Sequence, residues 1–269
     1  METLCALGCA LLLVGGPTVV LEVDGVRLVT DPTFDPAGTR YVQGPVEMTK
    51  TAGPALSPEE LGAVDAVLLS HDEHLDNLDH AGRAFVASAG LVLTTPAGAR
   101  RLKGSARGLA PWESTVVTGR NGRRLRVTAV PARHGPPGSE PLLGEVTGFV
   151  IERADTRGGG LYVSGDTVWF DELAQIKARL RPAAGILHMG DAHFAGTGEM
   201  QLTLDAETAL RLTRSLELRT VVPIHLDGWA HYRERRAAVE QRFRAASAGE
   251  TLLSLEPGKP APLTTPRRQ

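Results

Sequence analysis

"VDAVLLSHDEHLDNLD" (residues 64–79) places an apolar run directly before two histidines, three aspartates and one glutamate. The run "AVLLS" (66–70) has the length and composition of a buried strand. A strand that ends in an irregular loop can aim polar side chains into a shared crevice while the sheet holds them in place. The stretch is therefore either a solvated polar loop or a set of metal ligands at the end of a strand.

The same arrangement recurs along the chain, which favours the second reading. His134 follows "RVTAVPAR" (126–133), Asp166 follows "LYVSG" (161–165), and His225 follows "TVVPI" (220–224). Several strand ends that each present a His or an Asp indicate a common site. Imidazole and carboxylate ligands suit zinc, manganese or iron, and the only cysteines are Cys5 and Cys9, too few for a closed thiolate site. The residues predict an open, catalytic type of metal site.

The remaining pattern predicts a layered α/β or α+β domain with mixed sheets covered by helices. Early strands form hairpins, and later strands alternate with helices. Strands are expected at 10–14, 19–23, 26–30, 66–70, 90–95, 124–130, 147–152, 160–165, 184–189 and 219–225, and helices at 57–64, 171–180, 204–216 and 232–248. We expect one domain over residues 1–256 and a disordered, Pro-rich basic tail, "PGKPAPLTTPRRQ" (257–269).

Composition describes an ordinary globular protein. Hydrophobic residues make up 42%, charged residues 22%, and the formal charge is −2, so no basic excess points to nucleic acid. The uncharged stretch 3–21 is long enough to cross a bilayer, but Gly15, Gly16 and Pro17 interrupt it and a strand, Asp-Gly turn and strand follow. A strand, a Gly-Pro turn and a hairpin are favoured over an anchor or a signal peptide. The presence of only two cysteines fits a reducing cytoplasm. From the charge and the interrupted apolar stretch, we expect neither nucleic-acid nor membrane partners.

Seven segments resemble, in order and spacing, the metallo-β-lactamase superfamily. They are "GGPTVVLEVDGVRLVTDPTFDP" (15–36), "VDAVLLSHDEHLDNLD" (64–79), "VPARHGP" (130–136), "GFVIE" (148–152), "LYVSGDTVWF" (161–170), "HMGDAHF" (188–194) and "VVPIHLDGWAHY" (221–232). The branch most similar includes ascorbate-6-phosphate lactonase-like and phospholipase D-like hydrolases. The resemblance implies a four-layer αβ/βα sandwich of two mixed sheets. It also implies one or two divalent metal ions, zinc first, with manganese or iron as alternatives.

The metal ligands that the resemblance implies are His71, His74, Asp76, His134, Asp166 and His225, with Asp166 bridging two metals. The family's first motif, H-x-H-x-D-H, is one residue out of step here. Either Glu73 stands at the second histidine position, or the loop bulges so that His74 takes it and Asn77 replaces the last histidine. The second alignment is favoured because it keeps the His-x-Asp order. Asn77 is then a weak ligand or supports one.

Further residues are assigned supporting or catalytic roles. Asp31 either forms an Asp-Pro turn or supports the ligands from below, and Asp72 beside His71 is a candidate base or proton shuttle. Asp72 and Asp76 are therefore the candidate catalytic carboxylates. His188, His193 and His231 are expected to line the pocket, order ligands or contact substrate, or to have an ordinary hydrogen-bonding role.

These observations predict a metal-dependent hydrolase that uses a metal-activated hydroxide on a small ester, lactone or phosphodiester. One alternative is a phosphodiesterase that acts on nucleic acid or lipid head groups, for which the basic clusters "RNGRR" (120–124) and "RERRAAVEQRFR" (233–244) would have to be more than solvated faces. A second alternative is a non-catalytic protein of the same fold, with a degenerate second metal position at Asn77.

Overall fold

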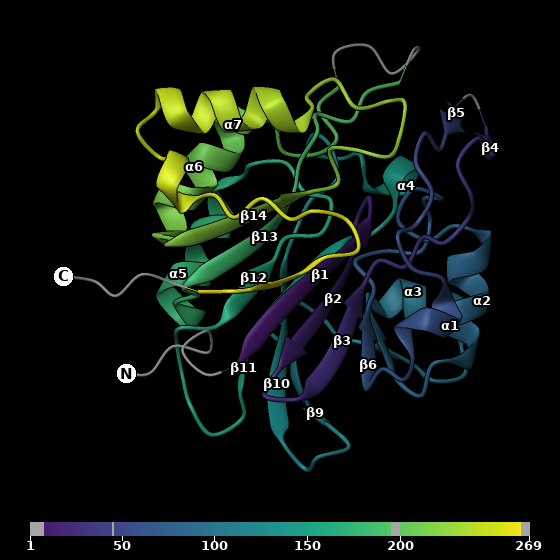
Figure 1. The fold of residues 1–269 in the computed structure, drawn as a ribbon, viewed down its shortest axis with the longest axis vertical. Coiled ribbons are helices and arrows are strands. Elements are labelled where there is room, and N and C mark those ends of the chain that lie inside the picture. Colours follow the sequence, from purple (N-terminus) through teal and green to yellow (C-terminus); the bar gives the residue numbers. More distant parts are fainter. Residues whose placement is uncertain (1–7, 45, 195–199, 265–269) are drawn as a thin grey trace.

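Two mixed β-sheets face each other at the centre of the molecule (Figure 1). The computed structural model describes residues 8–44, 46–194 and 200–264. The first sheet has the order β15-β1-β2-β3-β6-β7-β8, and the second the order β14-β13-β12-β11-β10-β9. The strands of the first are β1 (Cys9–Gly15), β2 (Thr18–Val23), β3 (Val26–Thr30), β6 (Ala66–Leu68), β7 (Val92–Thr94), β8 (Ala106–Gly108) and β15 (Pro260–Pro262). Those of the second are β9 (Ser114–Thr118), β10 (Arg124–Pro131), β11 (Thr147–Arg153), β12 (Leu161–Val163), β13 (Ala184–His188) and β14 (Thr220–Ile224).

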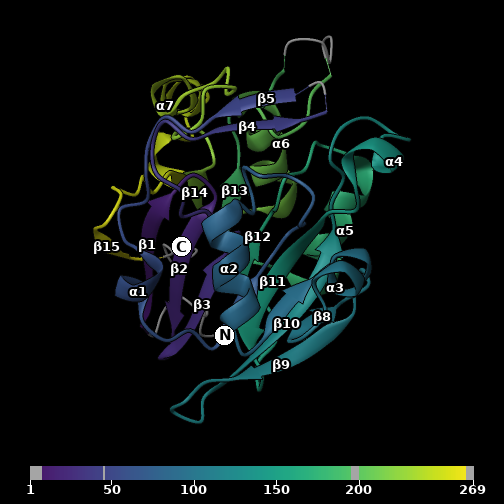
Figure 2. The same cartoon turned by 90° about the vertical axis from the view of Figure 1, so that its right-hand side faces the viewer.

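Helices cover the outer face of each sheet, so the domain has four layers (Figure 2). The first sheet is covered by α1 (Pro58–Leu61) and α2 (His80–Ser88), with α3 (Pro96–Leu102) beside β7 and β8. The second is covered by α5 (Ala174–Leu180), α6 (Ala206–Leu216) and α7 (Arg236–Ala245). The connections contain α4 (Glu140–Leu143), the 3-10 turns η2 (Asp171–Leu173) and η3 (Gly249–Thr251), and a hairpin of β4 (Arg40–Gln43) and β5 (Val46–Thr49). The four-layer sandwich expected from the resemblance is confirmed.

The main core lies between the sheets. Alternate side chains of β1, β2 and β3, such as Leu11, Leu21 and Leu28, meet those of β10, β11 and β13, such as Val127 and Ile186. Each of these side chains is fully buried, and burial of one such side chain stabilises the fold by about 1.5–3 kcal/mol. The two sheets are therefore held in a fixed relation, which their shared edge needs if it is to build a site.

Each strand expected from the sequence forms at its predicted place, and the segment after residue 9 is the predicted strand, turn and hairpin. Within the described part of the chain, no helix is long and apolar enough to cross a membrane. Residues 1–7, which include the start of the apolar stretch, lie outside the described residues. The helices α2 and α3 were not predicted, although Asp79 and Thr95 cap them through hydrogen bonds to Gly82 N and Gly98 N.

Two boundaries require correction. The tail was expected to be disordered from residue 257, but β15 pairs with β1, with Ala10 opposite Pro262, and Leu263 is buried. Prolines are tolerated there because an edge strand can leave one row of N–H positions unused; residues 265–269 lie outside the described part. The last predicted helix begins only at Arg236 instead of residue 232, since the segment before it forms bridges from Trp229 to Lys50 and from Tyr232 to Ala192.

Candidate metal centre

The carboxyl ends of strands from both sheets meet at one edge of the sandwich. β3 and β6 are parallel, as are β12, β13 and β14, and β10 runs in the same direction as β12 because β11 is antiparallel to both. The residues that lie at or shortly after these ends are Asp31, His71, His134, Asp166, His188 and His225. Chain direction and sheet order therefore bring together side chains that lie far apart in the sequence.

Three imidazole nitrogens converge at this edge. His74 Nδ1 lies 3.0 Å from His71 Nε2 and 3.0 Å from His134 Nε2. His134 Nδ1 donates to the carbonyl oxygen of Leu202 at 2.6 Å, so in the neutral ring the lone pair is on Nε2 and faces the other two histidines. Burial and the neighbouring histidines lower the pKa of His71, and they lower the pKa of His74 to about 4. These two rings are thus neutral at pH 7 and offer lone pairs in place of charge.

A second set, Asp76, Asp166 and His225, lies beside the first and is buried. His225 Nδ1 lies 2.9 Å from Asp166 Oδ1, and His225 Nε2 lies 3.8 Å from Asp76 Oδ2. In the described part of the molecule, His225 Nε2 has no hydrogen-bond partner. Burial opposes charge on Asp166, but His225 holds the pKa of that carboxyl well below its usual range.

Asp166 also acts on the first set, because its charge raises the pKa of His71 against the larger effect of burial. Its carboxylate therefore interacts with both sets of ligands. Among residues 8–44, 46–194 and 200–264, these two sets are the groups of three or more His, Cys, Asp or Glu side chains that could hold a metal ion, and the ligand atoms of each set lie within 4.8 Å of one another.

Asp31 joins the two sheets directly beside the site. Its Oδ1 accepts from the backbone N–H of Ser70 at 2.6 Å, and its Oδ2 lies 2.9 Å from His188 Nε2. Asp31 and His188 are both buried, and the His188 ring lies 5.6 Å from the His225 ring. Asp31 has a φ of +28°, in a region that non-glycine residues rarely adopt. This geometry suits the supporting role considered for Asp31.

Gly165 lets Asp166 approach the opposite sheet. With φ at +60°, a Cβ at this position would lie 2.7 Å from the carbonyl oxygen of Thr147 and 2.8 Å from Cβ of Ser70. Any larger residue would push the β12 end away from the β6 end. The end of β12 therefore lies close to Thr147 and Ser70.

The loop that carries the first motif is anchored by a buried ion pair that sequence reasoning missed. Lys50 Nζ lies 2.8 Å from Asp79 Oδ2, and their side chains are 4% and 0% exposed. Asp79 also accepts from the backbone N–H groups of Phe34, Asp35 and Gly82 at 2.7 to 2.9 Å. Asp79 could have been recognised as a helix cap, but no sequence signal links it to Lys50, 29 residues away.

The geometry distinguishes the two alignments of the first motif. His74 joins the histidine cluster, whereas the Glu73 carboxylate faces Arg101 on α3. Asn77 is fully buried, and neither of its side-chain polar atoms hydrogen-bonds to another described residue. It is therefore His74, and not Glu73, whose side chain lies with His71 and His134.

Asp72 needs a different role from the one predicted. Both of its carboxylate oxygens accept from Arg101 Nε, at 3.1 and 3.0 Å. Since Arg101 takes up both oxygens, the arrangement does not support Asp72 as base or proton shuttle, and we assign it to holding the loop against α3.

His188, His193 and His231 lie in different surroundings. His188 contacts Asp31, as described above. His193 Nε2 accepts from Arg233 at 2.6 Å, and His193 belongs to neither set. His231 Nε2 lies 3.0 Å from Asp76 Oδ2 and is therefore next to the second set.

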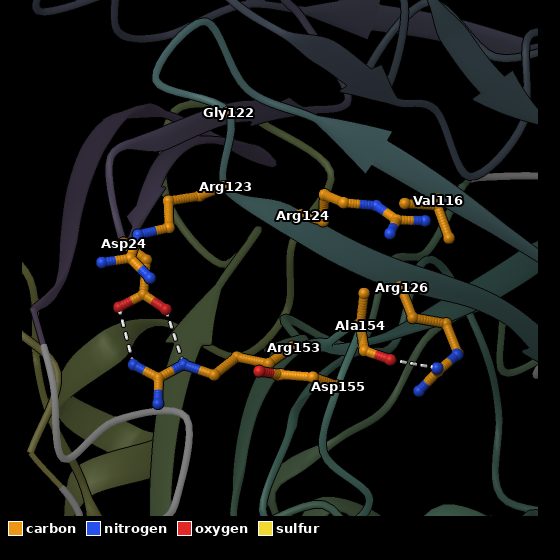
Figure 3. Close-up of a pocket in the computed structure, with 9 residues that line it drawn as sticks. All are labelled: Asp24, Val116, Gly122, Arg123, Arg124, Arg126, Arg153, Ala154 and Asp155. Carbon is orange, nitrogen blue, oxygen red and sulfur yellow. Dashed lines mark hydrogen bonds and ion pairs between the residues drawn. The ribbon is translucent and has the colours of Figure 1, made fainter.

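A cavity of about 340 Å³ adjoins His134. Its lining comes from the start of α3, the end of β10 and the segment around α4, and includes Arg100, Arg133, Glu140 and Glu145. A larger cavity, of about 790 Å³, lies at the other end of β10 and β11, where four arginines gather (Figure 3). There Arg153 forms a two-pronged ion pair with Asp24 at 2.6 and 2.8 Å. Of these two cavities, the smaller one lies beside the histidine cluster.

Comparison with known proteins agrees with this geometry. The family model for the β-lactamase superfamily domain matches residues 26–226, about three quarters of the chain. The chain belongs to this family. The matched range begins at β3 and ends just after His225, so it contains all six side chains of the two sets.

Named relatives point to metal-dependent hydrolysis. A UPF0173 metal-dependent hydrolase of Herpetosiphon aurantiacus is 26% identical over 233 residues, which cover 83% of this chain and 90% of the relative. A shorter match, 30% identical over 117 residues, spans 44% of this chain and 45% of a UPF0173 metal-dependent hydrolase of Solibacter usitatus. Both relatives are named metal-dependent hydrolases, which agrees with the predicted type of activity, while the lactonase-like branch stays a prediction.

A solved structure shows the same fold. The isothiocyanate hydrolase from Delia radicum gut bacteria is 22% identical, with a TM-score of 0.78 over 94% of this chain and 98% of that one. The likeness extends over nearly the full length of both chains, so the two proteins share the fold.

Proposed function

We propose that the protein hydrolyses a small ester, lactone or phosphodiester at a centre that holds one or two divalent metal ions, zinc first. The observation that carries the proposal is the convergence of three imidazole nitrogens, with both close pairs at 3.0 Å, beside the set of Asp76, Asp166 and His225. Neutral imidazole and carboxylate groups in such numbers are ligands that zinc, manganese and iron accept.

The surrounding residues fit a cation. In the first set, His71 Nε2 and His134 Nε2 both face His74 Nδ1. A ring nitrogen carries either one proton or one lone pair, so His74 Nδ1 cannot form a good hydrogen bond with both neighbours. In the second set, His225 Nε2 is buried and lacks a partner among the described residues. A buried polar atom without a partner costs about 1–3 kcal/mol, and a bound cation would remove that cost.

When bound, a divalent ion lowers the pKa of a water molecule toward neutrality and polarises the bond under attack. The chain's own residues prepare this site. The Leu202 carbonyl oxygen fixes the His134 ring through Nδ1, and Asp31 fixes the loop at Ser70. Although burial opposes it, His231 and His225 hold the pKa of Asp76 below its usual range, so Asp76 is ionised at neutral pH. It can bind a cation or accept a proton, but it has no proton to donate.

The position of the cavities favours a small substrate. The cavity beside His134 has a volume suited to a small molecule. The arginine cluster that a nucleic-acid substrate would use lies at the start of β10, and His134 follows its end. Eight residues of strand span about 25 Å, so that cluster does not adjoin the histidines.

The proposal is tested by metal analysis and hydrolysis assays on protein expressed with added zinc, manganese or iron. We expect at least one bound ion per chain, and cleavage of either bis-p-nitrophenyl phosphate or a member of a lactone panel that stops after chelation and returns with metal. His134→Ala should lose metal and activity, whereas His193→Ala, which removes a histidine outside both sets, should keep both. Less than one ion per chain in the wild type, or equal metal and activity in the two variants, would contradict the proposal.

A further inference from the structure

The second set of ligands has no histidine at the position of Asn77, where the family's motif has one. His231 lies beside this second set. Asn77 occupies the place at which the motif's last histidine is expected. It forms no side-chain hydrogen bond within the described part of the structure, and thus none to Asp76, Asp166 or His225. An amide oxygen is also a weaker ligand for zinc than an imidazole nitrogen.

His231 presents a nitrogen to the same carboxylate oxygen that His225 faces. The distance from His231 Nε2 to Asp76 Oδ2 is 3.0 Å, and the distance from His225 Nε2 to the same oxygen is 3.8 Å. Two ligands about 2.1 Å from one tetrahedral zinc ion lie about 3.4 Å apart, so both spacings suit atoms that share a cation.

The ring of His231 is held in place by residues outside the first motif. Its side chain is 4% exposed and lies between Phe194, at 4.5 Å between ring centroids, and Tyr232, also at 4.5 Å. The backbone carbonyl of His231 accepts from His193 N at 3.0 Å, which fixes the segment. Nδ1 has no hydrogen-bond partner among the described residues, so the ring makes its one polar contact through Nε2.

From this arrangement we propose that His231 is a ligand of the second metal ion and takes the place of the histidine that Asn77 replaces. The second position is then formed by Asp76, Asp166, His225 and His231. This inference rests on the proposed function, and it goes further because it makes the second position as complete as the first. The extra residue in the loop and the presence of Asn77 then do not reduce the number of metals bound.

The test is metal stoichiometry and affinity, measured by elemental analysis and by calorimetric titration of the metal-free protein with zinc. The variants are His231→Gln and His231→Ala, with His193→Ala as the matched control. Gln keeps a donor for Asp76 but is a poor zinc ligand, so a merely structural hydrogen bond would survive in His231→Gln. Circular dichroism and the Tm of each metal-free variant show whether it is folded.

We expect two ions per chain in the wild type and in His193→Ala, and one tightly bound ion in both His231 variants, with the second bound at least about 10-fold more weakly. Two ions with unchanged affinity in His231→Gln would overturn the inference while the proposed function stands. A wild-type protein that binds one ion would also overturn the inference and leave the proposed function in place. A wild-type protein that binds no metal would contradict the proposed function itself.

Discussion

Replacement of Lys50 by Met should destabilise the protein strongly, because it leaves the buried carboxylate of Asp79 uncompensated at the end of the loop that carries the first motif. Asp79 is 0% exposed and Lys50 4% exposed, and their atoms are 2.8 Å apart. Burial lowers the pKa of Lys50, and Asp79 opposes that shift. Removing one partner of such a pair costs about 3–5 kcal/mol, a large part of the roughly 5–15 kcal/mol of a typical domain.

The loss in Lys50→Met arises from charge and not from volume, since Met fills nearly the same space. The three backbone N–H groups that donate hydrogen bonds to the Asp79 carboxylate remain in place, so they still stabilise part of its charge. The double variant Lys50→Met/Asp79→Asn should recover part of the loss, because the uncompensated charge is gone. Lys259→Met removes a lysine that pairs with Glu256 on the surface, and we expect no measurable change from it.

The assay is urea unfolding of the metal-free protein, extrapolated linearly to water, so that metal binding does not add to the stability. We expect the unfolding free energy of Lys50→Met to be about 3–5 kcal/mol below that of the wild type, with an unchanged m-value. A loss smaller than about 1 kcal/mol would show that the pair behaves like a surface ion pair and would refute this account of the loop.

Three further predictions concern the loop and its ligands. A Cβ on Gly82 would lie 1.8 Å from the carbonyl oxygen of Pro32, so Gly82→Ala should lower the unfolding free energy by about 2 kcal/mol or more, whereas Gly90→Ala, with nothing within 4 Å, should leave the Tm unchanged. Because the pKa of His74 falls from 6.5 to about 4 on folding, the unfolded chain binds the proton more tightly between those values. This shift on its own should therefore cost the metal-free protein up to about 3 kcal/mol as the pH falls from 6.5 to 4, and urea unfolding that shows no loss of stability between pH 7.5 and pH 5 would contradict it. Asp72→Asn should keep most of the hydrolytic activity, whereas Asp76→Asn should lose it by about 100-fold or more, and comparable losses in the two would restore a catalytic role to Asp72.

Much of the fold was predictable because it depends on local patterns. Strands such as β6 and β14 are short apolar runs, and polar side chains follow each of them within three residues. The position of His134, Asp166 and His225 at strand ends was enough to indicate a shared site, since parallel strands bring their carboxyl ends to one edge. The sandwich arrangement came from the resemblance and not from these patterns.

The direction of individual side chains was not predictable, because partners distant in the sequence determine it. Asp72 is next to His71, yet Arg101 on α3 draws its carboxylate away from the histidines. His231 had no strand end or motif to distinguish it from His193, and only the pairing of residues 192 and 232 shows which of them faces Asp76. The order of the tail likewise depends on β1, some 250 residues earlier in the chain.

Anomalous diffraction from crystals of the zinc-replete protein, recorded on both sides of the zinc absorption edge, tests the metal centre most directly. We expect one peak among the ring nitrogens of His71, His74 and His134, and a second among the side chains of Asp76, Asp166, His225 and His231. A map from metal-replete crystals with no peak at either position would contradict the metal centre.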